Sequence, residues 1–462
     1  MNKKLPGIFF VITLLSLFLI FQEGTSQTFD TAYARKLQNA LNTLKANNNL
    51  VGISGAVYVP GQGVWTGAAG ISEPGVNITP EMVFSIGSIS KNFVAANILQ
   101  LAEADSLSLD DPLYKWLPRY TNIDSTITIK RLLNHTSGIY NFTDNSAYLS
   151  AINADFGRYW QLEESLQYVL SPYFSQGAGW RYSNTNYVLL AMIIKKITGH
   201  NLSEEFHSRF FTPLNMTGSF IEIKDTLNVP WVHNWVDLNG DGILDDASFI
   251  PQTSFASSTM GAGGVISRPE NLLTWVKNVF TPGRVLSQSS LNQMTTFVSA
   301  SISGANGYGL GTMRYNIVGK ICWGHAGNSF GHSTVAMYYP QDSVCMSLMM
   351  NRDINTGAVA NSFMNTVLTN RPVSVQNISS KTPDKFVLHQ NYPNPFNPET
   401  NIKFDLASQG EVKLTIYNSL GKEIENIFSG KLSAGSYQYK WNAGNFPSGI
   451  YFYKLNTENS SI

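Results

Sequence analysis

Apolar side chains follow a helical spacing near the start of the chain and a strand-like alternation soon afterwards. Between residues 28 and 46 they recur every three or four positions along one stripe, which predicts an amphipathic helix. The stripe is formed by Phe29, Tyr33, Leu37, Leu41 and Leu44. Residues 51–59 and 64–70 read as two strands, and the Pro-Gly-Gln-Gly sequence between them is typical of a hairpin turn.

The rest of the first 370 residues continues in a mixed pattern. Up to about residue 260 it is mostly helical, with long loops. Three successive strand-like segments follow at residues 321–325, 333–339 and 343–349, and residues 357–369 read as a last helix. This order predicts an α/β fold for residues 27–370: a five-stranded antiparallel sheet covered by the two terminal helices, with the helical insertion beside it.

The pattern changes after this domain. Residues 371–385 are polar and without periodicity, which predicts a linker. Beyond them, apolar residues alternate in short runs, as at Val412, Leu414 and Ile416, and glycines recur at turn positions. Residues 386–462 are therefore predicted to form a small all-β sandwich.

The N-terminus has the pattern of a secretory signal peptide. Lys3 and Lys4 precede an apolar run over residues 5–21, and small residues follow at positions 24–26. We expect residues 1–26 to be removed during export. A membrane anchor is the alternative, although the run is marginal in length for a span. No cysteine follows it that could carry a lipid, and no other stretch could cross a bilayer, so we expect a secreted or cell-surface protein.

Charge and cysteine content narrow the class further. Lysine plus arginine and aspartate plus glutamate number 31 each, so there is no basic excess to suggest nucleic acid as a partner. The two cysteines, Cys322 and Cys345, fall on the first and third of the three successive predicted strands. The outer strands of such a meander lie about 10 Å apart, beyond the reach of a disulfide. We therefore predict two buried free thiols.

A serine and a lysine stand three residues apart where a loop is predicted to enter a helix. Ser88 and Lys91 follow the loop at residues 84–87, and apolar residues then recur with helical spacing. Backbone N–H groups in a first helical turn are unpaired and favour developing negative charge. Lys91 lies on the same face one turn later. This arrangement suits a nucleophile with a proton-handling partner, and the alternative is a capping serine and a solvated lysine. A second Ser-x-x-Lys begins at Ser419, in a segment that reads as strand and turn.

Two further motifs complete a set suited to acyl transfer. Tyr182-Ser183-Asn184 offers proton-handling and amide groups, although alone it is equally typical of a turn at a helix start. His325-Ala326-Gly327 lies in a predicted strand and offers a backbone edge for an oxyanion, whereas a lone histidine is more often structural. In combination with Ser88, the motifs favour a catalytic site.

The segments around all three motifs resemble the serine β-lactamase and D-alanyl-D-alanine carboxypeptidase family, most closely its carboxypeptidase and class C branch. The likeness covers roughly residues 45–350. Further matching segments, in order, are residues 107–112, 132–138, 180–187, 197–199, 261–265 and 307–311.

The resemblance implies an acyl-enzyme on Ser88, with Lys91 and Tyr182 as candidates for the group that takes the serine proton. A tyrosine acts as a base only if its pKa falls, and a nearby lysine charge is expected to lower it. Asn184 is expected to hydrogen-bond Lys91 and the substrate amide. Backbone N–H groups of Ser88 and Asn328 are expected to form the oxyanion hole.

The strand motif carries the main departures from the family pattern. His325 stands where β-lactamases usually have lysine, and we expect it to take part in proton transfer, so that activity falls as the pH drops through the histidine range. Gly327 is expected to let the substrate lie against the strand. Ala326 and Asn328 replace the hydroxyl residues of the carboxypeptidases, and Arg314 comes one residue later than their carboxylate-binding arginine. A one-residue shift on a strand turns a side chain to the other face.

We therefore expect a secreted serine hydrolase with a small peptide, β-lactam or ester substrate. Peptidoglycan-type peptides are favoured, with carboxypeptidase activity ahead of β-lactamase activity. An esterase of the same fold and a non-catalytic cleft-binding protein are the alternatives.

One loop resembles a calcium site. Oxygen-bearing residues recur at alternate positions at Asp237, Asn239, Asp241 and Asp245, but the twelfth position is Ser248 instead of the usual glutamate. A polar surface loop is the alternative to a structural calcium ion. No histidine–carboxylate cluster suggests a catalytic metal, and we expect catalysis without a cofactor.

Residues 391–398 (Asn-Tyr-Pro-Asn-Pro-Phe-Asn-Pro) and 447–451 (Pro-Ser-Gly-Ile-Tyr) look like the type A sorting domain of type IX secretion. This resemblance implies the type IX secretion machinery as a partner.

Overall fold

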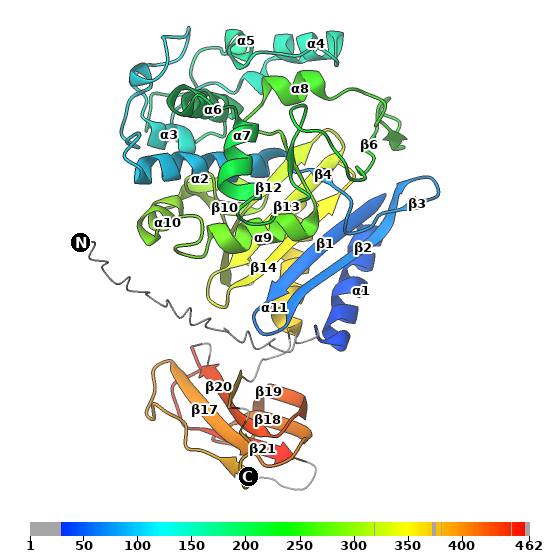
Figure 1. Ribbon diagram of the computed structural model, residues 1–462, viewed down its shortest axis with the longest axis vertical. Coiled ribbons are helices and arrows are strands. Elements are labelled where there is room, and N and C mark those ends of the chain that lie inside the picture. Colours follow the sequence, from blue (N-terminus) through cyan, green and yellow to red (C-terminus); the bar gives the residue numbers. More distant parts are fainter. Residues whose placement is uncertain (1–28, 318, 372–375, 380, 445, 458–462) are drawn as a thin grey trace, which may run out of the picture.

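The computed structural model describes residues 29–317, 319–371, 376–379, 381–444 and 446–457, so the predicted signal peptide lies outside the described residues. A larger α/β domain (blue to yellow) is followed by a smaller β-rich domain (orange to red) (Figure 1).

The larger domain is built on an antiparallel sheet of nine strands in the order β3-β2-β1-β14-β13-β12-β11-β10-β9. The bounds are β1 Gly52–Val59, β2 Gly63–Glu73, β3 Val76–Asn77, β9 Val298–Ile302, β10 Ala305–Tyr308, β11 Met313–Ile317, β12 Lys320–Ser329, β13 His332–Tyr339 and β14 Val344–Met350.

The predicted fold class is confirmed, and all five predicted strands lie side by side as β2, β1, β14, β13 and β12. The predicted size of the sheet is wrong, because β3 extends one edge and β9, β10 and β11 extend the other. These four strands have only two to five residues each, and glycines lie within or next to the last three, such as Gly307 in β10 and Gly304 between β9 and β10. Such short, interrupted runs do not show a clear period of two.

Helices cover both faces of the sheet. The bounds are α1 Thr31–Asn47, α2 Ser90–Glu103, α3 Ile129–Leu133, α4 Ser146–Ala154, α5 Leu162–Ser165, α6 Asn184–Thr198, α7 Leu202–Phe206, α8 Thr253–Ser258, α9 Pro269–Val279, α10 Gln288–Met294 and α11 Thr356–Asn370. As predicted, α1 and α11 pack together on one face, where Leu37, Leu41 and Phe363 are fully buried. The other face packs on α9 and on the helical insertion (Figure 1).

A second, three-stranded sheet lies where the helical insertion meets the main sheet. Its order is β4 (Phe84–Ser85), β8 (Val265–Ser267) and β5 (Phe220–Ile221), with β8 antiparallel to both neighbours. The chain leaving β4, the chain entering β8 and the chain leaving β5 therefore meet at one edge. This edge positions the candidate active site.

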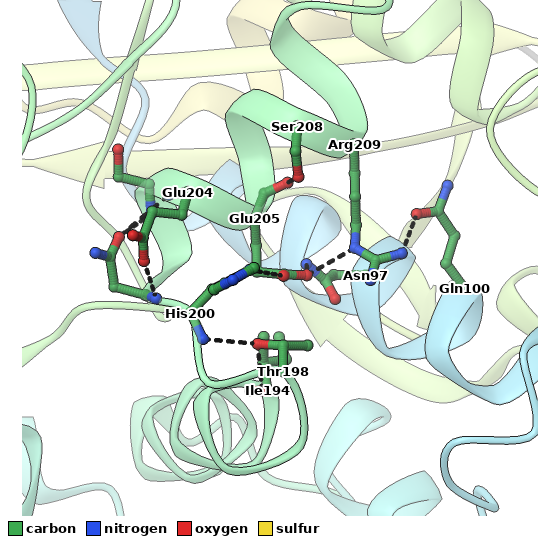
Figure 2. Close-up of polar contacts among 11 residues, drawn as sticks. Asn97, Gln100, Ile194, Thr198, His200, Glu204, Glu205, Ser208 and Arg209 are labelled. Carbon is green, nitrogen blue, oxygen red and sulfur yellow. Dashed lines mark hydrogen bonds and ion pairs between the residues drawn. The ribbon is translucent and has the colours of Figure 1, made fainter.

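A buried carboxylate ties the helices of the insertion together (Figure 2). Glu205 accepts hydrogen bonds from Asn97 of α2 at 3.1 Å and from Arg209 at 2.6 Å, and its other oxygen lies 3.2 Å from His200 Nδ1. Burial alone would raise the pKa of Glu205, but the bonds from Arg209 and Asn97 outweigh burial and hold that pKa below its usual value. The network connects α2, which follows Ser88, to the segment after α6.

The C-terminal domain has two sheets, as the predicted sandwich requires: β15-β20-β17-β16 and β19-β18-β21. The bounds are β15 Gln376–Ser379, β16 Val387–Leu388, β17 Glu399–Leu406, β18 Gly410–Asn418, β19 Glu423–Leu432, β20 Gly435–Asn442 and β21 Tyr451–Thr457. The predicted linker is partly wrong, because β15 lies within it and pairs with β20. Ser419 lies in the turn between β18 and β19, as its sequence context predicted.

Both cysteines are buried and free, as predicted. Cys322 on β12 and Cys345 on β14 are separated by β13, and they belong to the cores on opposite faces of the sheet. Among the described residues, no helix combines the length and the apolar character that crossing a bilayer requires.

Candidate active site

Ser88 lies on a short 3₁₀ turn, Gly87–Ile89, between β4 and α2. The following residue braces this turn: the Ser90 hydroxyl donates to the Gly87 carbonyl at 2.7 Å and accepts from the Val265 N–H at 3.1 Å. Ser88 itself is partly exposed, whereas its neighbours in the turn are buried. The turn therefore presents the hydroxyl of Ser88 to the cleft on a fixed backbone.

Lys91 lies directly behind Ser88 and is fully buried. Its Nζ is 2.9 Å from Ser88 Oγ and 2.7 Å from the carbonyl oxygen of Ala262, which comes just before β8. No carboxylate in the described part of the chain forms an ion pair with it. Burial without a negative partner lowers the pKa of Lys91 well below its ordinary value, so the site favours the neutral amine.

Tyr182 lies against Lys91, with the lysine Nζ 4.8 Å from the centre of the tyrosine ring. The Tyr182 hydroxyl is buried and forms no hydrogen bond of normal geometry with a described residue. The nearby Ser88 side chain nevertheless tends to lower the pKa of Tyr182. The expected fall in the pKa of Tyr182 is wrong: burial raises it, and the contribution from Ser88 is smaller. The structure thus gives a neutral tyrosine beside a lysine that tends to be neutral.

Asn184 begins α6, so the Tyr-Ser-Asn motif does stand at a helix start. Its side chain lines the same cavity as Ser88, but its Nδ2 donates to Thr143 Oγ1 at 2.9 Å. The expected hydrogen bond to Lys91 is not formed, because the lysine Nζ is held by Ser88 and Ala262. A contact between Asn184 and the substrate amide stays a prediction.

His325 on β12 is buried behind the cleft and has a fixed tautomer. Its Nδ1 is 2.6 Å from the carbonyl oxygen of Ala326, so this nitrogen carries the proton, and its Nε2 accepts from the Tyr308 hydroxyl at 2.9 Å. Burial, with a smaller contribution from Lys91, lowers the pKa of His325 to about 3. The expected loss of activity through the ordinary histidine range is therefore wrong as an effect of His325, which stays neutral there.

Gly327 and Gly87 allow β12 to touch the nucleophile turn. A Cβ on Gly327 would lie 2.0 Å from the Ile86 carbonyl oxygen and 2.9 Å from the Ser88 backbone nitrogen. A Cβ on Gly87, whose φ is +50°, would lie 2.3 Å from the Asn328 carbonyl oxygen and 2.8 Å from its nitrogen. Gly327 is thus needed because a larger residue would collide with the turn that carries Ser88. The sequence predicted a different role for Gly327, which was to let the substrate lie against the strand.

The two backbone segments proposed for the oxyanion hole are therefore in direct contact. The Asn328 side chain turns away and donates to Ser333 Oγ at 2.7 Å and to the Ile354 carbonyl at 3.1 Å. Arg314 on β11 is also directed elsewhere: its guanidinium donates to Asn306 on β10. It does not contribute to the described lining of the cavity at Ser88.

The cavity at Ser88 has a volume of about 60 Å³, and one of the residues that line it was not predicted from the sequence. Besides Ser88, Asn184 and Asn328, it is lined by Glu222, the residue that follows β5. Residues 255–264 form the remaining side. The available signal was a single acidic residue within the apolar run Phe220-Ile221-Glu222-Ile223.

The candidate calcium loop satisfies its own backbone. Asp237 accepts hydrogen bonds from the N–H groups of Gly240, Asp241 and Gly242, and Asp245 accepts one from Leu238. The described residues contain no group of three or more histidine, cysteine or acidic side chains that could hold a metal ion. Calcium binding at this loop stays a prediction.

Comparison with known proteins identifies two families in the chain. The Beta-lactamase family matches residues 37–369, and the Secretion system C-terminal sorting domain matches residues 390–462. Among curated relatives, Penicillin-binding protein 4 of Amycolatopsis lactamdurans is 27% identical over 71% of this chain and 86% of its own length. Penicillin-binding protein 4* of Bacillus subtilis is 35% identical, but the match spans 29% of each chain.

Solved structures agree with this assignment. The D-stereospecific amidohydrolase from Streptomyces sp. is 28% identical with a TM-score of 0.64, over 73% of this chain and 99% of that one. The D-amino acid amidase from Ochrobactrum anthropi SV3 shares the fold, with 22% identity and a TM-score of 0.66 over 74% and 100% of the two chains. The C-terminal sorting domain indicates export by type IX secretion to the exterior or the cell surface. The chain belongs to the Beta-lactamase family of serine hydrolases.

Proposed function

We propose that the larger domain hydrolyses an amide bond next to a D-amino acid through an acyl-enzyme on Ser88. The observation that carries this proposal is the 2.9 Å contact between Ser88 Oγ and the buried Nζ of Lys91. Burying a lysine without a carboxylate is costly unless the amine is neutral. A neutral amine that faces a serine hydroxyl is a general base, and a protein that only binds a ligand in the cleft has no need of one.

The chemistry follows from these positions. The neutral amine donates to the Ala262 carbonyl and turns its lone pair to the Ser88 hydroxyl. As Ser88 Oγ forms a bond with the substrate carbonyl carbon, its proton passes to Lys91, and the backbone N–H groups at Ser88 and Asn328 stabilise the oxyanion. The Tyr182 hydroxyl takes a proton from the ammonium as it gives its own to the leaving nitrogen, and the C–N bond breaks. Water then attacks the ester, and the same groups move its proton.

Two observations favour an amide without a terminal carboxylate. The relative with a solved structure at 28% identity is named a D-stereospecific amidohydrolase. In addition, the described lining of the cavity contains no arginine, and Asn328, which is part of it, stands at a position where the carboxypeptidases have a hydroxyl residue. Peptidoglycan-type peptides with a D-Ala-D-Ala end are the second candidate, which the penicillin-binding relatives support. Short esters remain an alternative, since they also lack a carboxylate.

Active-site labelling tests the proposal directly. Treatment with a fluorophosphonate or a penicillin should add one adduct to the intact mass, and Ser88→Ala should remove it. Ser419→Ala is the matched control, because it changes the other Ser-x-x-Lys serine and should leave labelling intact. Labelling that persists in Ser88→Ala would overturn the assignment. Steady-state rates on a D-amino acid amide, a D-Ala-D-Ala peptide, a cephalosporin and a short ester then rank the substrates.

A further inference from the structure

Glu222 is a carboxylate in the wall of the catalytic cavity. It follows β5, and its backbone N–H donates to the Gly264 carbonyl at 2.8 Å, beside the Ala262 carbonyl that holds Lys91. Its side chain lines the same 60 Å³ cavity as Ser88 and also borders a separate pocket of about 420 Å³. Only 9% of its surface is exposed. The small sheet that presents Ser88 therefore also presents this carboxylate.

The carboxylate of Glu222 forms no ion pair and no side-chain hydrogen bond with any described residue. The other buried carboxylate among the described residues, Glu205, does have such partners in Arg209 and Asn97. Burial raises the pKa of Glu222 to about 7. A buried carboxylate without a protein partner costs folding free energy, so the fold keeps at this place a group that is free to pair with a ligand.

We propose that Glu222 is a specificity-determining residue that binds a positively charged amino group on the acyl half of the substrate. This inference rests on the proposed function of Ser88. A cavity of about 60 Å³ beside Ser88 accommodates only the atoms closest to the reacting carbonyl. An α-amino group is two bonds from that carbon, and its ammonium form is a compact cation with three donors. The substrate class is therefore D-amino acid amides or peptides with a free α-amine.

The neighbouring pocket does not supply a competing cation. Its other titratable side chains already have partners: Asp225 pairs with His207, and His233 lies 2.7 Å from Asp246. The lysine nearest the nucleophile, Lys91, is held by Ser88 and Ala262. A cationic substrate is thus the partner that the carboxylate of Glu222 lacks.

A matched pair of substrates tests the inference: D-alanine p-nitroanilide, with a free amine, and its N-acetyl derivative, which is neutral. The wild-type protein should prefer the free amine by at least about tenfold in kcat/KM, as expected for a charge-assisted hydrogen bond. Glu222→Gln keeps the shape and removes the charge. It should lower kcat/KM for the free amine about 10- to 100-fold, mainly through KM, and leave the acetylated substrate within about twofold.

The control is Glu81→Gln, which removes the same charge from an exposed position near Ser88 in sequence and should leave both rates unchanged. Thermal melting of Glu222→Gln should match or exceed that of the wild type, since the change removes a buried unpaired charge. Equal losses on both substrates, or a wild type without preference, would overturn the inference. If the wild type cleaves both substrates through Ser88 without preference, only the role of Glu222 fails. If Ser88 is not labelled and neither substrate is cleaved, the proposed function fails with it. Should Glu222→Gln not fold, the wild-type preference still decides.

Discussion

Replacing Gly327 with alanine should inactivate the enzyme by separating β12 from the nucleophile turn. The added Cβ would lie 2.0 Å from the Ile86 carbonyl oxygen, whereas real Cβ contacts essentially never fall below 3.0 Å. Both partners are backbone, so no side chain can rotate away, and the two segments must move apart by about 1 Å. That shift acts on the Ser88 and Asn328 N–H groups together.

The size of the effect follows from what these groups do. A displacement of about 1 Å in a catalytic group costs on the order of 100-fold in rate, and loss of one oxyanion donor costs about 100- to 1000-fold. We expect Gly327→Ala to lower kcat by at least about 100-fold, and overpacking to cost about 1–3 kcal/mol of stability. The assay is the rate of fluorophosphonate labelling and of amide hydrolysis, with thermal melting alongside.

The matched control is Gly157→Ala, at a glycine of the same domain where an added Cβ meets only Asp155 Oδ1 at 3.4 Å, an ordinary contact. It should retain full activity. If Gly327→Ala folds and keeps kcat within about threefold of the wild type, the contact between the two backbones does not set the geometry of the site.

Five other outcomes follow from the structure. Lys91→Gln should lower kcat by about 100- to 10,000-fold, since it removes the proposed base. Because burial lowers the pKa of Lys91, wild-type activity should be lost as the pH falls through that pKa. The pKa of His325 is about 3, so His325→Gln should leave the position of this acidic limb in the pH–rate profile unchanged. Glu205→Ala should cost about 2–4 kcal/mol in urea unfolding, because its partly buried partners lose their carboxylate; a loss below 1 kcal/mol would count against the network as a support of α2. A fragment of residues 27–375 should keep the rate of the full chain, since the C-terminal domain has its own core, and a severalfold change in KM would show that it contributes to the cleft. Millimolar calcium should raise the melting temperature only if the loop at residues 237–245 binds the ion, and a calcium-independent melting temperature would leave it a polar loop.

The central strands and the terminal helices could be predicted because their periodicity is strong. In the main sheet β13 and β14 are buried along their whole length, and most of their residues are apolar. The outer strands β9 to β11 could not be predicted in the same way, because they are short and closely separated by glycine-containing turns. The β15 strand was hidden for a different reason: it is short and polar, and it is defined by pairing with β20, about 60 residues later.

Within the site, the spacing of the motifs predicted which residues lie there, but it could not predict their protonation states. Ser88 and Lys91 meet because three residues make one helical turn, which sequence alone fixes. The pKa values of Tyr182 and His325 depend on burial by segments far apart in the chain, and the sequence gives no measure of that burial. Glu222 was missed for the same reason: no motif marks it, and only the pairing of β5 with β8 brings it to the cavity.

The neighbourhood of Lys91 is rich in buried polar groups that the described residues leave without partners. They include the hydroxyl of Tyr182, the Nε2 of His135 and the Nε1 of Trp180. Their rings contact one another, with centroids 4.3 Å apart for His135 and Tyr182 and 6.2 Å apart for His135 and Trp180.

Each such atom costs on the order of 1–3 kcal/mol relative to a satisfied one. If the sequence had been selected for stability alone, such unpaired groups would be replaced, because the large majority of buried polar groups in proteins are paired. Their concentration beside a buried lysine without a carboxylate partner therefore indicates that the fold gives up stability here. Under the proposed mechanism, the gain is a Tyr182 hydroxyl that is near Ser88 and that no other described residue holds in a hydrogen bond of normal geometry.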